Sequence, residues 1–344
     1  MAGALRAEGA DVRFVGGTRA EAELVPAAGY ELEQLNVRGI DRRNPVRAAK
    51  AVSLAVGAVL RSRALLEQLE PDAVMGGGGY VAGVVGGAAV SRRLPLVLTE
   101  ADSHLGLSNR ALARFADRVC LAFPIEGRSG PRYRVTGRPG PAPVTDRAGA
   151  REQLGIGPDE PSVLVFGGSL GARSINEAAI EALAGAGFHV LHVTGTRDHP
   201  DLVAIAPGGR YELRDYLDSE SFSTALAASD LVVARAGGSI FEVAAHGRPA
   251  ILVPYPRATR NHQAANARWM ERAGAAVVIE DSQLTPVRLA HEVAALLGDK
   301  GRLAAMARAS AELARPDAAR DIASEVLAAA ARGRKHSRRR RVRR

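Results

Sequence analysis

Residues 162–172 read SVLVFGGSLGA, and this stretch decides the fold class. The run 163–166 is apolar at every position, without polar alternation, which predicts a strand covered on both faces. Glycines follow immediately, and residues 175–184 show the spacing of an amphipathic helix. A buried strand, a glycine turn and a helix in succession are typical of a doubly wound α/β domain.

The same succession recurs along the 344-residue chain. A proline-rich segment at 137–144 (GRPGPAPV) interrupts it and predicts a linker. We therefore expect two doubly wound, Rossmann-like α/β domains that face a cleft, at 1–141 and 142–312. A C-terminal helix at 313–331 would pack back on the first domain, and a disordered basic tail would occupy 332–344. The other predicted strands lie at 12–15, 72–75, 96–99, 119–123, 189–193, 231–233, 250–253 and 276–279.

The beginning of the chain departs from this pattern. Residues 1–8 predict a helix, whereas a doubly wound domain opens with a strand and a glycine-rich turn. The sequence thus predicts that the first strand and glycine loop of the N-terminal domain are missing, which would expose a sheet edge. A misplaced start codon or a fragment would explain this.

Charge is concentrated in the tail. The net charge is +9, from 46 Lys and Arg against 37 Asp and Glu, and nine of the basic residues lie in 332–344, so the rest is formally neutral. The tail is expected to be a solvated end or to attract anionic lipid. Nucleic-acid binding is not expected, because the body carries no motif for it and few aromatic residues.

The sequence also excludes several kinds of site and segment. The single cysteine, Cys120, lies in an apolar run and excludes an internal disulfide framework or a thiolate zinc site. The N-terminus lacks the apolar core of a signal peptide. The best candidate for a membrane span, 48–66, contains three basic residues, so no transmembrane helix is predicted.

Three turns in the second half carry candidate binding residues. In 166–172, Gly168, Ser169 and Gly171 would let backbone amides and a helix N-terminus approach a phosphate; the alternative is a plain tight turn. After the strand at 231–233, Glu242 could accept hydrogen bonds from a ribose diol, or could be a solvated helix residue. The residues suited to sugar hydroxyls, or else to helix capping, are His262, Gln263 and Asn266.

Two turns in the first half are further candidates. Residues 76–83 (GGGGYVAG) allow close backbone approach to a ligand. Residues 99–106 (TEADSHLG) hold Glu100, Asp102 and His104, any of which could act as a general base. The plainer interpretation is that Asp102 or Ser103 caps the helix expected at 107–115.

The ordered set of motifs resembles glycosyltransferase family 28, specifically the lipid II-forming N-acetylglucosaminyltransferases of peptidoglycan synthesis (the MurG type). The resemblance rests on GGGGYVAG, LTEADSHLGLSNRALARFADRV, GGSLGARSIN, ARAGGSIFEVAAHGRPAILVPYP and NHQAANA. It implies the glycosyltransferase B architecture, UDP-N-acetylglucosamine as donor, an undecaprenyl-linked lipid acceptor, inversion at the sugar and no metal or other cofactor. It also implies a peripheral position on the cytoplasmic face of the bacterial cell membrane.

The resemblance also implies residue roles. Gly168, Ser169 and Gly171 would hold the diphosphate, and Glu242 the ribose. Uracil would meet the backbone near Ile240. His262 and Gln263 would touch the N-acetylglucosamine hydroxyls, with Asn266 supporting them. The acceptor side would be lined by Gly79, Tyr80 and Asp102.

Several positions depart from the family pattern. The glycine loop with the histidine proposed as catalytic base is absent, and the family's His-Glu-Gln-Asn turn reads Thr-Glu-Ala-Asp at 99–102, so the base stays unassigned. An expected arginine is Pro141, and an expected glutamine is Leu170. The alternatives are another glycosyltransferase B enzyme, a catalytically impaired UDP-sugar binder, or an epimerase of the same fold. Residues 38–47 and the helix after them could lie on an anionic membrane, or could be an ordinary part of the first domain.

Overall fold

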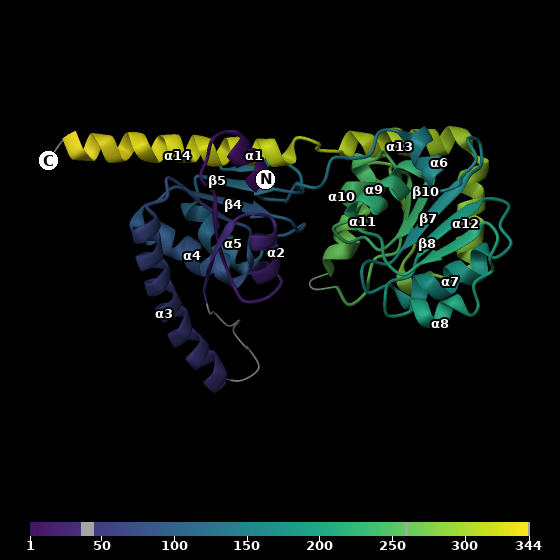
Figure 1. Ribbon diagram of the computed structural model, residues 1–344, viewed down its shortest axis with the longest axis horizontal. Helices are drawn as coiled ribbons and strands as arrows, with labels where there is room; N and C mark the ends of the chain where they lie inside the picture. Colours follow the sequence, from purple (N-terminus) through teal and green to yellow (C-terminus); the bar gives the residue numbers. More distant parts are fainter. Residues whose placement is uncertain (36–44, 259–260, 343–344) are drawn as a thin grey trace. The chain divides into compact units, whose positions relative to one another are not determined.

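The computed structural model describes residues 1–35, 45–258 and 261–342. It divides into two compact units. Unit 1 comprises Met1–Pro139 with Asp317–Arg344, and unit 2 comprises Gly140–Pro316. Both are built from parallel strands and helices (Figure 1).

Unit 2 contains one six-stranded parallel sheet in the order β12-β11-β10-β7-β8-β9. All five residues of β7 are buried. Helices α7 and α12 pack on the face that carries Val163 and Val165. The strands are β7 (Ser162–Phe166), β8 (His189–Val193), β9 (Tyr211–Arg214), β10 (Leu231–Ala234), β11 (Ala250–Leu252) and β12 (Ala276–Val278). The helices are α6 (Arg147–Gln153), α7 (Arg173–Leu183), α8 (His199–Val203), α9 (Ser219–Ala228), α10 (Ile240–Ala245), α11 (His262–Arg272), η3 (Asp281–Gln283), α12 (Pro286–Gly298) and α13 (Lys300–Leu313).

Unit 1 contains two parallel sheets, β1-β2 and β3-β4-β5-β6. Within the described residues, β1 and β3 each have a neighbouring strand on one side only. The strands are β1 (Arg13–Gly16), β2 (Glu31–Gln34), β3 (Val74–Gly76), β4 (Leu96–Glu100), β5 (Arg118–Leu121) and β6 (Tyr133–Val135). The helices are α1 (Ala2–Ala7), α2 (Glu21–Ala27), α3 (Pro45–Leu69), α4 (Gly79–Arg92), α5 (Leu107–Leu112), η1 (Ala113–Phe115) and α14 (Ala318–Val342).

Helix α14 belongs to unit 1 although it follows unit 2 in the chain. Ile322 and Val326 pack in one core cluster with Val97 and Cys120. Glu325, on the same helix, accepts hydrogen bonds from Arg118 at 2.7 Å and from Arg134 at 2.9 Å. Burial raises the pKa of the Cys120 thiol to about 12, as expected for a core cysteine.

Three strands escape the sequence analysis, namely β2, β6 and β9. Each lies at an edge of its sheet. Edge strands have one side open to solvent, so they carry charged residues such as Glu31, Arg134 and Glu212 among the apolar ones. The edge strands β1, β3 and β12 are predicted because they keep an apolar stretch, whereas charged residues interrupt β2, β6 and β9.

Helix α14 includes residues 332–342, part of the segment for which the sequence predicts a disordered basic tail. Arginine and lysine are good helix formers, and a helix already nucleated by packing extends at little further cost.

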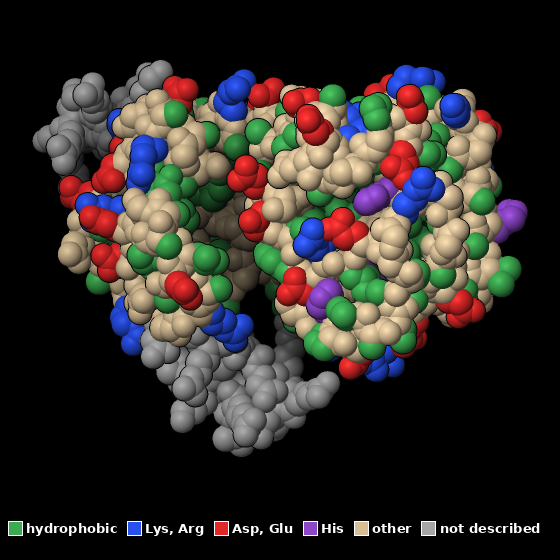
Figure 2. Space-filling model, turned by 45° about the vertical axis from the view of Figure 1, so that its right-hand side comes forward, with side chains coloured by type: hydrophobic (Ala, Val, Ile, Leu, Met, Phe, Trp, Pro, Cys, Tyr) green, Lys and Arg blue, Asp and Glu red, His purple; other side chains and the backbone are tan. Residues whose placement is uncertain are grey.

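On the face of the molecule shown in Figure 2, acidic and basic side chains are interspersed, in keeping with a formally neutral body.

The membrane segment predicted at 38–47 falls mostly on residues 36–44, which lie outside the described part of the chain. In the described residues, no helix combines the length and apolar character needed to cross a membrane.

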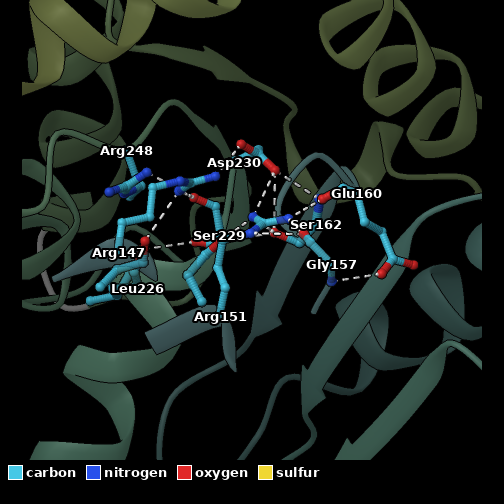
Figure 3. Close-up of polar contacts among 11 residues, drawn as sticks. Arg147, Arg151, Gly157, Glu160, Ser162, Leu226, Ser229, Asp230 and Arg248 are labelled. Carbon is cyan, nitrogen blue, oxygen red and sulfur yellow. Dashed lines mark hydrogen bonds and ion pairs between the residues drawn. The ribbon is translucent and has the colours of Figure 1, made fainter. Parts of the chain in front are cut away.

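A cluster of arginines joins the segment after the linker to the rest of unit 2 (Figure 3). Arg147 donates to the Ser229 carbonyl at 2.8 Å and contacts Asp230 at 2.5 Å. Arg151 donates to the Ala228 carbonyl at 2.8 Å, and Arg248 to the Ser229 carbonyl at 2.9 Å. These carbonyls end α9, where the helix dipole is negative, so the guanidinium groups complete the helix terminus and hold α6 against it.

Replacing Arg151 by Met should lower the free energy of unfolding by about 3 kcal/mol, because a side chain only 5% exposed loses its carbonyl partners and its ion pair. Arg210→Met is the control. The Arg210 side chain is 64% exposed, so its ion pair with Glu160 should contribute less than about 1 kcal/mol to the free energy of unfolding. Urea unfolding measures both. Equal losses in the two variants would contradict the assignment.

Candidate functional site

The candidate site lies at the carboxyl edge of the unit 2 sheet. Phe166 ends β7 and pairs with Ala234 of β10 on one side and Val193 of β8 on the other. Because these parallel strands end in register, the turns that follow them meet at one edge. The predicted phosphate turn and the predicted ribose turn are therefore neighbours.

The turn after β7 requires glycine. Gly168 and Gly171 have φ angles of +102° and +77°, which side chains rarely adopt. A Cβ on Gly171 would overlap the Thr194 carbonyl oxygen, and one on Gly195 would overlap the backbone of Gly171. The two turns thus touch backbone to backbone.

The start of α7, directly after this turn, has no side-chain cap. The N-cap residue, Ala172, provides no side-chain cap, and the helix has 11 residues. Ser169 beside it is exposed. Uncapped amides at the positive end of a helix, next to a serine hydroxyl, are suited to bind phosphate oxygens.

The turn after β10 is held by a buried arginine that the sequence analysis did not select. Arg235 is 8% exposed and donates to Asp281 at 2.6 Å, to Ser174 Oγ at 2.8 Å and to the Val253 carbonyl at 3.1 Å. Its guanidinium carbon also lies 5.5 Å from the centroid of the Tyr255 ring. Arg235 therefore ties the ends of β10 and β11 to the start of α7. Its place directly after an apolar strand is the only sequence signal for this role.

The residues predicted to contact nucleoside lie on α10. The Ile240 side chain is fully buried, so this position offers a ligand only its backbone. Glu242 lies in the first turn of α10 and is half-buried. The structure thus places both at the carboxyl edge of the sheet, beyond β10.

Helix α11 supports the same turns. Asn266 is 3% exposed and donates to the Ala236 carbonyl at 3.0 Å. Gln263 accepts a hydrogen bond from the Tyr255 amide at 2.9 Å. His262 is half-buried at the first position of the helix. The Asn266 side chain therefore holds the turn after β10, and the side-chain oxygen of Gln263 holds the turn after β11.

In unit 1 the three candidates for the general base differ in burial and in hydrogen bonding. Glu100 is 8% exposed, and its carboxylate accepts from the Gly106 amide at 2.8 Å and from Asn109 Nδ2 at 3.0 Å. It anchors its loop. Asp102 is exposed and His104 is half-buried. The prediction that Asp102 or Ser103 caps the following helix is wrong, because the N-cap of α5 is Gly106 and the loop is closed by Glu100 instead.

The other acceptor-side candidates lie where α4 begins. Gly79 has a φ of +77° and opens the helix directly after β3. Tyr80 follows it, and its buried hydroxyl has no hydrogen-bond partner. Across the described residues, no group of three His, Cys, Asp or Glu side chains is placed to hold a metal ion.

Comparison with known proteins identifies the family. The profile of the glycosyltransferase family 28 N-terminal domain matches residues 1–121, and that of the family 28 C-terminal domain matches residues 162–322. The chain belongs to glycosyltransferase family 28. It is therefore a glycosyltransferase, as the motifs indicate.

Curated relatives carry a more specific name. The protein of Rubrobacter xylanophilus is 40% identical over 341 residues, which cover 97% of this chain and 99% of the relative. That of Mycolicibacterium paratuberculosis is 40% identical, covering 89% and 78%. Both are named UDP-N-acetylglucosamine--N-acetylmuramyl-(pentapeptide) pyrophosphoryl-undecaprenol N-acetylglucosamine transferase.

Solved structures agree in fold. The crystal structure of Acinetobacter baumannii MurG matches with a TM-score of 0.78 and 28% identity, covering 94% of this chain and 92% of that one. The calicheamicin glycosyltransferase CalG4 matches with a TM-score of 0.66, covering 94% and 93%, and at 19% identity it supports the fold alone. The predicted family, and the fold class of two doubly wound α/β domains with glycosyltransferase B architecture, are confirmed.

The contact between glycine turns can be tested by substitution. Gly171→Ala should destabilise unit 2 by about 2 kcal/mol or more, because positive φ strain adds to overlap with the Thr194 carbonyl. Gly185→Ala is the matched control, because Gly185 also has a positive φ, +69°, but a Cβ there would meet open space. This substitution should lower the free energy of unfolding by about 1 kcal/mol. Thermal unfolding of both variants gives the comparison. If Gly171→Ala were no worse than Gly185→Ala, the backbone contact would not constrain the turn.

Proposed function

We propose that this chain transfers N-acetylglucosamine from UDP-N-acetylglucosamine to undecaprenyl-diphospho-N-acetylmuramoyl-pentapeptide, turning lipid I into lipid II. The observation that carries the proposal is the uncapped start of α7 beside the Gly168–Gly171 turn and the Glu242 turn. This arrangement suits a nucleoside diphosphate, and relatives that match nearly the whole chain are named for this reaction.

The proposed reaction is a single displacement at C1 of the donor sugar. The muramoyl hydroxyl oxygen attacks the sugar C1 from the face opposite the diphosphate, and the C1–O bond to UDP breaks with inversion. The leaving diphosphate gains negative charge, which backbone amides at 168–171 and the α7 dipole would stabilise without a metal ion. A general base takes the proton of the attacking hydroxyl.

Unit 1 would supply the acceptor side, with Gly79, Tyr80 and Asp102. The candidates for the general base are Asp102 and His104, since the Glu100 carboxylate is already engaged by its own loop. In unit 2, Glu242 would hold the ribose, and His262 and Gln263 would contact the sugar.

The acceptor would be membrane-embedded, so we propose peripheral attachment to the cytoplasmic face of the bacterial membrane. The nine basic residues of 332–344 support this. Each basic residue near an anionic surface contributes about 1 kcal/mol of attraction.

A second candidate is a UDP-sugar binder without transfer activity. Two features of the loop at 99–106 favour this candidate. Position 99, where the family has a histidine, is a threonine, and the Glu100 carboxylate accepts hydrogen bonds from backbone amides of its own loop. A third is a transferase that uses another acceptor, as the shared fold with CalG4 allows.

The assay is transfer of radiolabelled N-acetylglucosamine to lipid I in anionic vesicles, with EDTA present. We expect labelled lipid II and equimolar UDP. Donor binding without transfer would identify the inactive binder, and transfer only to other lipids would identify the third candidate. Absence of donor binding would reject the assignment altogether.

Glu242→Gln tests the nucleoside contact. Loss of charge-assisted hydrogen bonds to the ribose should raise the dissociation constant of UDP by about tenfold to a hundredfold. Calorimetry should show a smaller loss for 2′-deoxy-UDP, which lacks one of the two hydroxyls. Glu177→Gln, on the exposed surface of α7, is the control and should bind UDP normally. Equal losses for both nucleotides would mean that Glu242 does not read the diol.

A further inference from the structure

A network of buried polar side chains lies beneath the 167–171 turn. Its members are Tyr211, His192, Asn176, Thr194 and Asp198, each less than 7% exposed. None of them was selected by the sequence analysis. Buried polar groups are costly unless hydrogen-bonded, so a cluster of this size at one point requires an explanation.

The network reaches the glycine turn through Asn176. Asn176 Nδ2 donates to the Thr194 carbonyl at 2.9 Å and to Asp198 Oδ2 at 3.1 Å. The Thr194 carbonyl is the group that leaves no room for a Cβ on Gly171. A Cβ on Gly171 would also lie 3.4 Å from Asn176 Nδ2. Asn176 therefore sets how closely the two turns approach.

The hydrogen bonds allow one arrangement of protons. Since Asn176 Nδ2 donates twice, its Oδ1 faces His192 Nε2 at 3.1 Å and must accept. Nε2 then carries the proton, so Nδ1 of the neutral ring accepts from the Tyr211 hydroxyl at 2.9 Å. Burial, with a smaller contribution from His199, lowers the pKa of His192 to about 3 and keeps the ring neutral.

Asp198 extends the network to the surface. Its carboxylate accepts two hydrogen bonds from Arg197, at 2.7 and 3.0 Å, and lies 3.6 Å from Arg173 at the start of α7. Asn176 thus links the buried tyrosine and histidine to both the backbone and the cations around the turn.

We propose that Tyr211 and His192 are positioning residues, which hold Asn176 in the one orientation that gives the 167–171 turn its diphosphate-binding shape. This inference rests on the proposed function, because it takes the turn to bind the diphosphate of UDP. Tyr211 orients His192, His192 orients Asn176, and Asn176 spaces α7 from the Thr194 carbonyl. Neither positioning residue touches the nucleotide.

The test compares Tyr211→Phe with His189→Gln. Tyr211→Phe removes the hydroxyl that donates to His192 Nδ1 and leaves the ring held only through Nε2, so the UDP dissociation constant should rise about tenfold while that of uridine, which has no phosphate, stays unchanged. His189 is also on β8 and 8% exposed, but it lies three residues from His192 and so on the opposite face of the sheet. His189→Gln should bind UDP within twofold of the wild type.

Nitrogen NMR tests the proton arrangement of His192 directly. Wild-type His192 should show the Nε2-protonated tautomer alone, and in Tyr211→Phe the Nδ1 resonance should shift because that nitrogen loses its hydrogen-bond donor. A wild-type ring protonated on Nδ1 would overturn the proposal, as would equal losses of UDP and uridine affinity. Wild-type protein that binds no UDP would reject the proposed function as well, whereas UDP binding that Tyr211→Phe leaves unchanged would reject the positioning role alone.

Discussion

The candidate site depends on a single backbone contact, that of Gly171 with Thr194 and Gly195. No side chain fits between these turns, so the two glycines meet the Thr194 carbonyl directly, and Asn176 holds that carbonyl in place. The start of α7, which follows this contact, has no side-chain cap and lies at the edge where β7, β8 and β10 end together. Every further element of unit 2 that we assign to the donor is placed relative to this edge.

Two layers of polar contacts support that arrangement. On one side, Arg235, Gln263 and Asn266 hold the turns after β10 and β11 through backbone carbonyls and amides. On the other, Asn176 holds the turn after β8. A site that stabilises a leaving diphosphate through oriented amides requires such rigidity, because the amides contribute only if they do not reorient during the reaction.

The sequence predicts most of the architecture, because interior parallel strands such as β7 are covered on both faces and therefore read as continuous apolar runs. The edge strands β2, β6 and β9 are not predicted, because charged residues interrupt their apolar runs, whereas the edge strand β12 keeps such a run and is predicted. The glycine turns are predicted from their place between strand and helix. Arg235, Asn176 and His192 are not, because a buried polar residue resembles an exposed one until its partners, distant in sequence, are brought to it. Asp102 illustrates the same difficulty: it looks like a helix cap, yet Glu100 closes the loop.

The most direct test of the account is amide hydrogen exchange of the full chain, with and without UDP-N-acetylglucosamine, in EDTA. The account predicts that the donor slows exchange at residues 168–175 and 236–242, and that EDTA leaves this protection intact. Unchanged exchange at these two segments, or protection that requires a divalent cation, would contradict it.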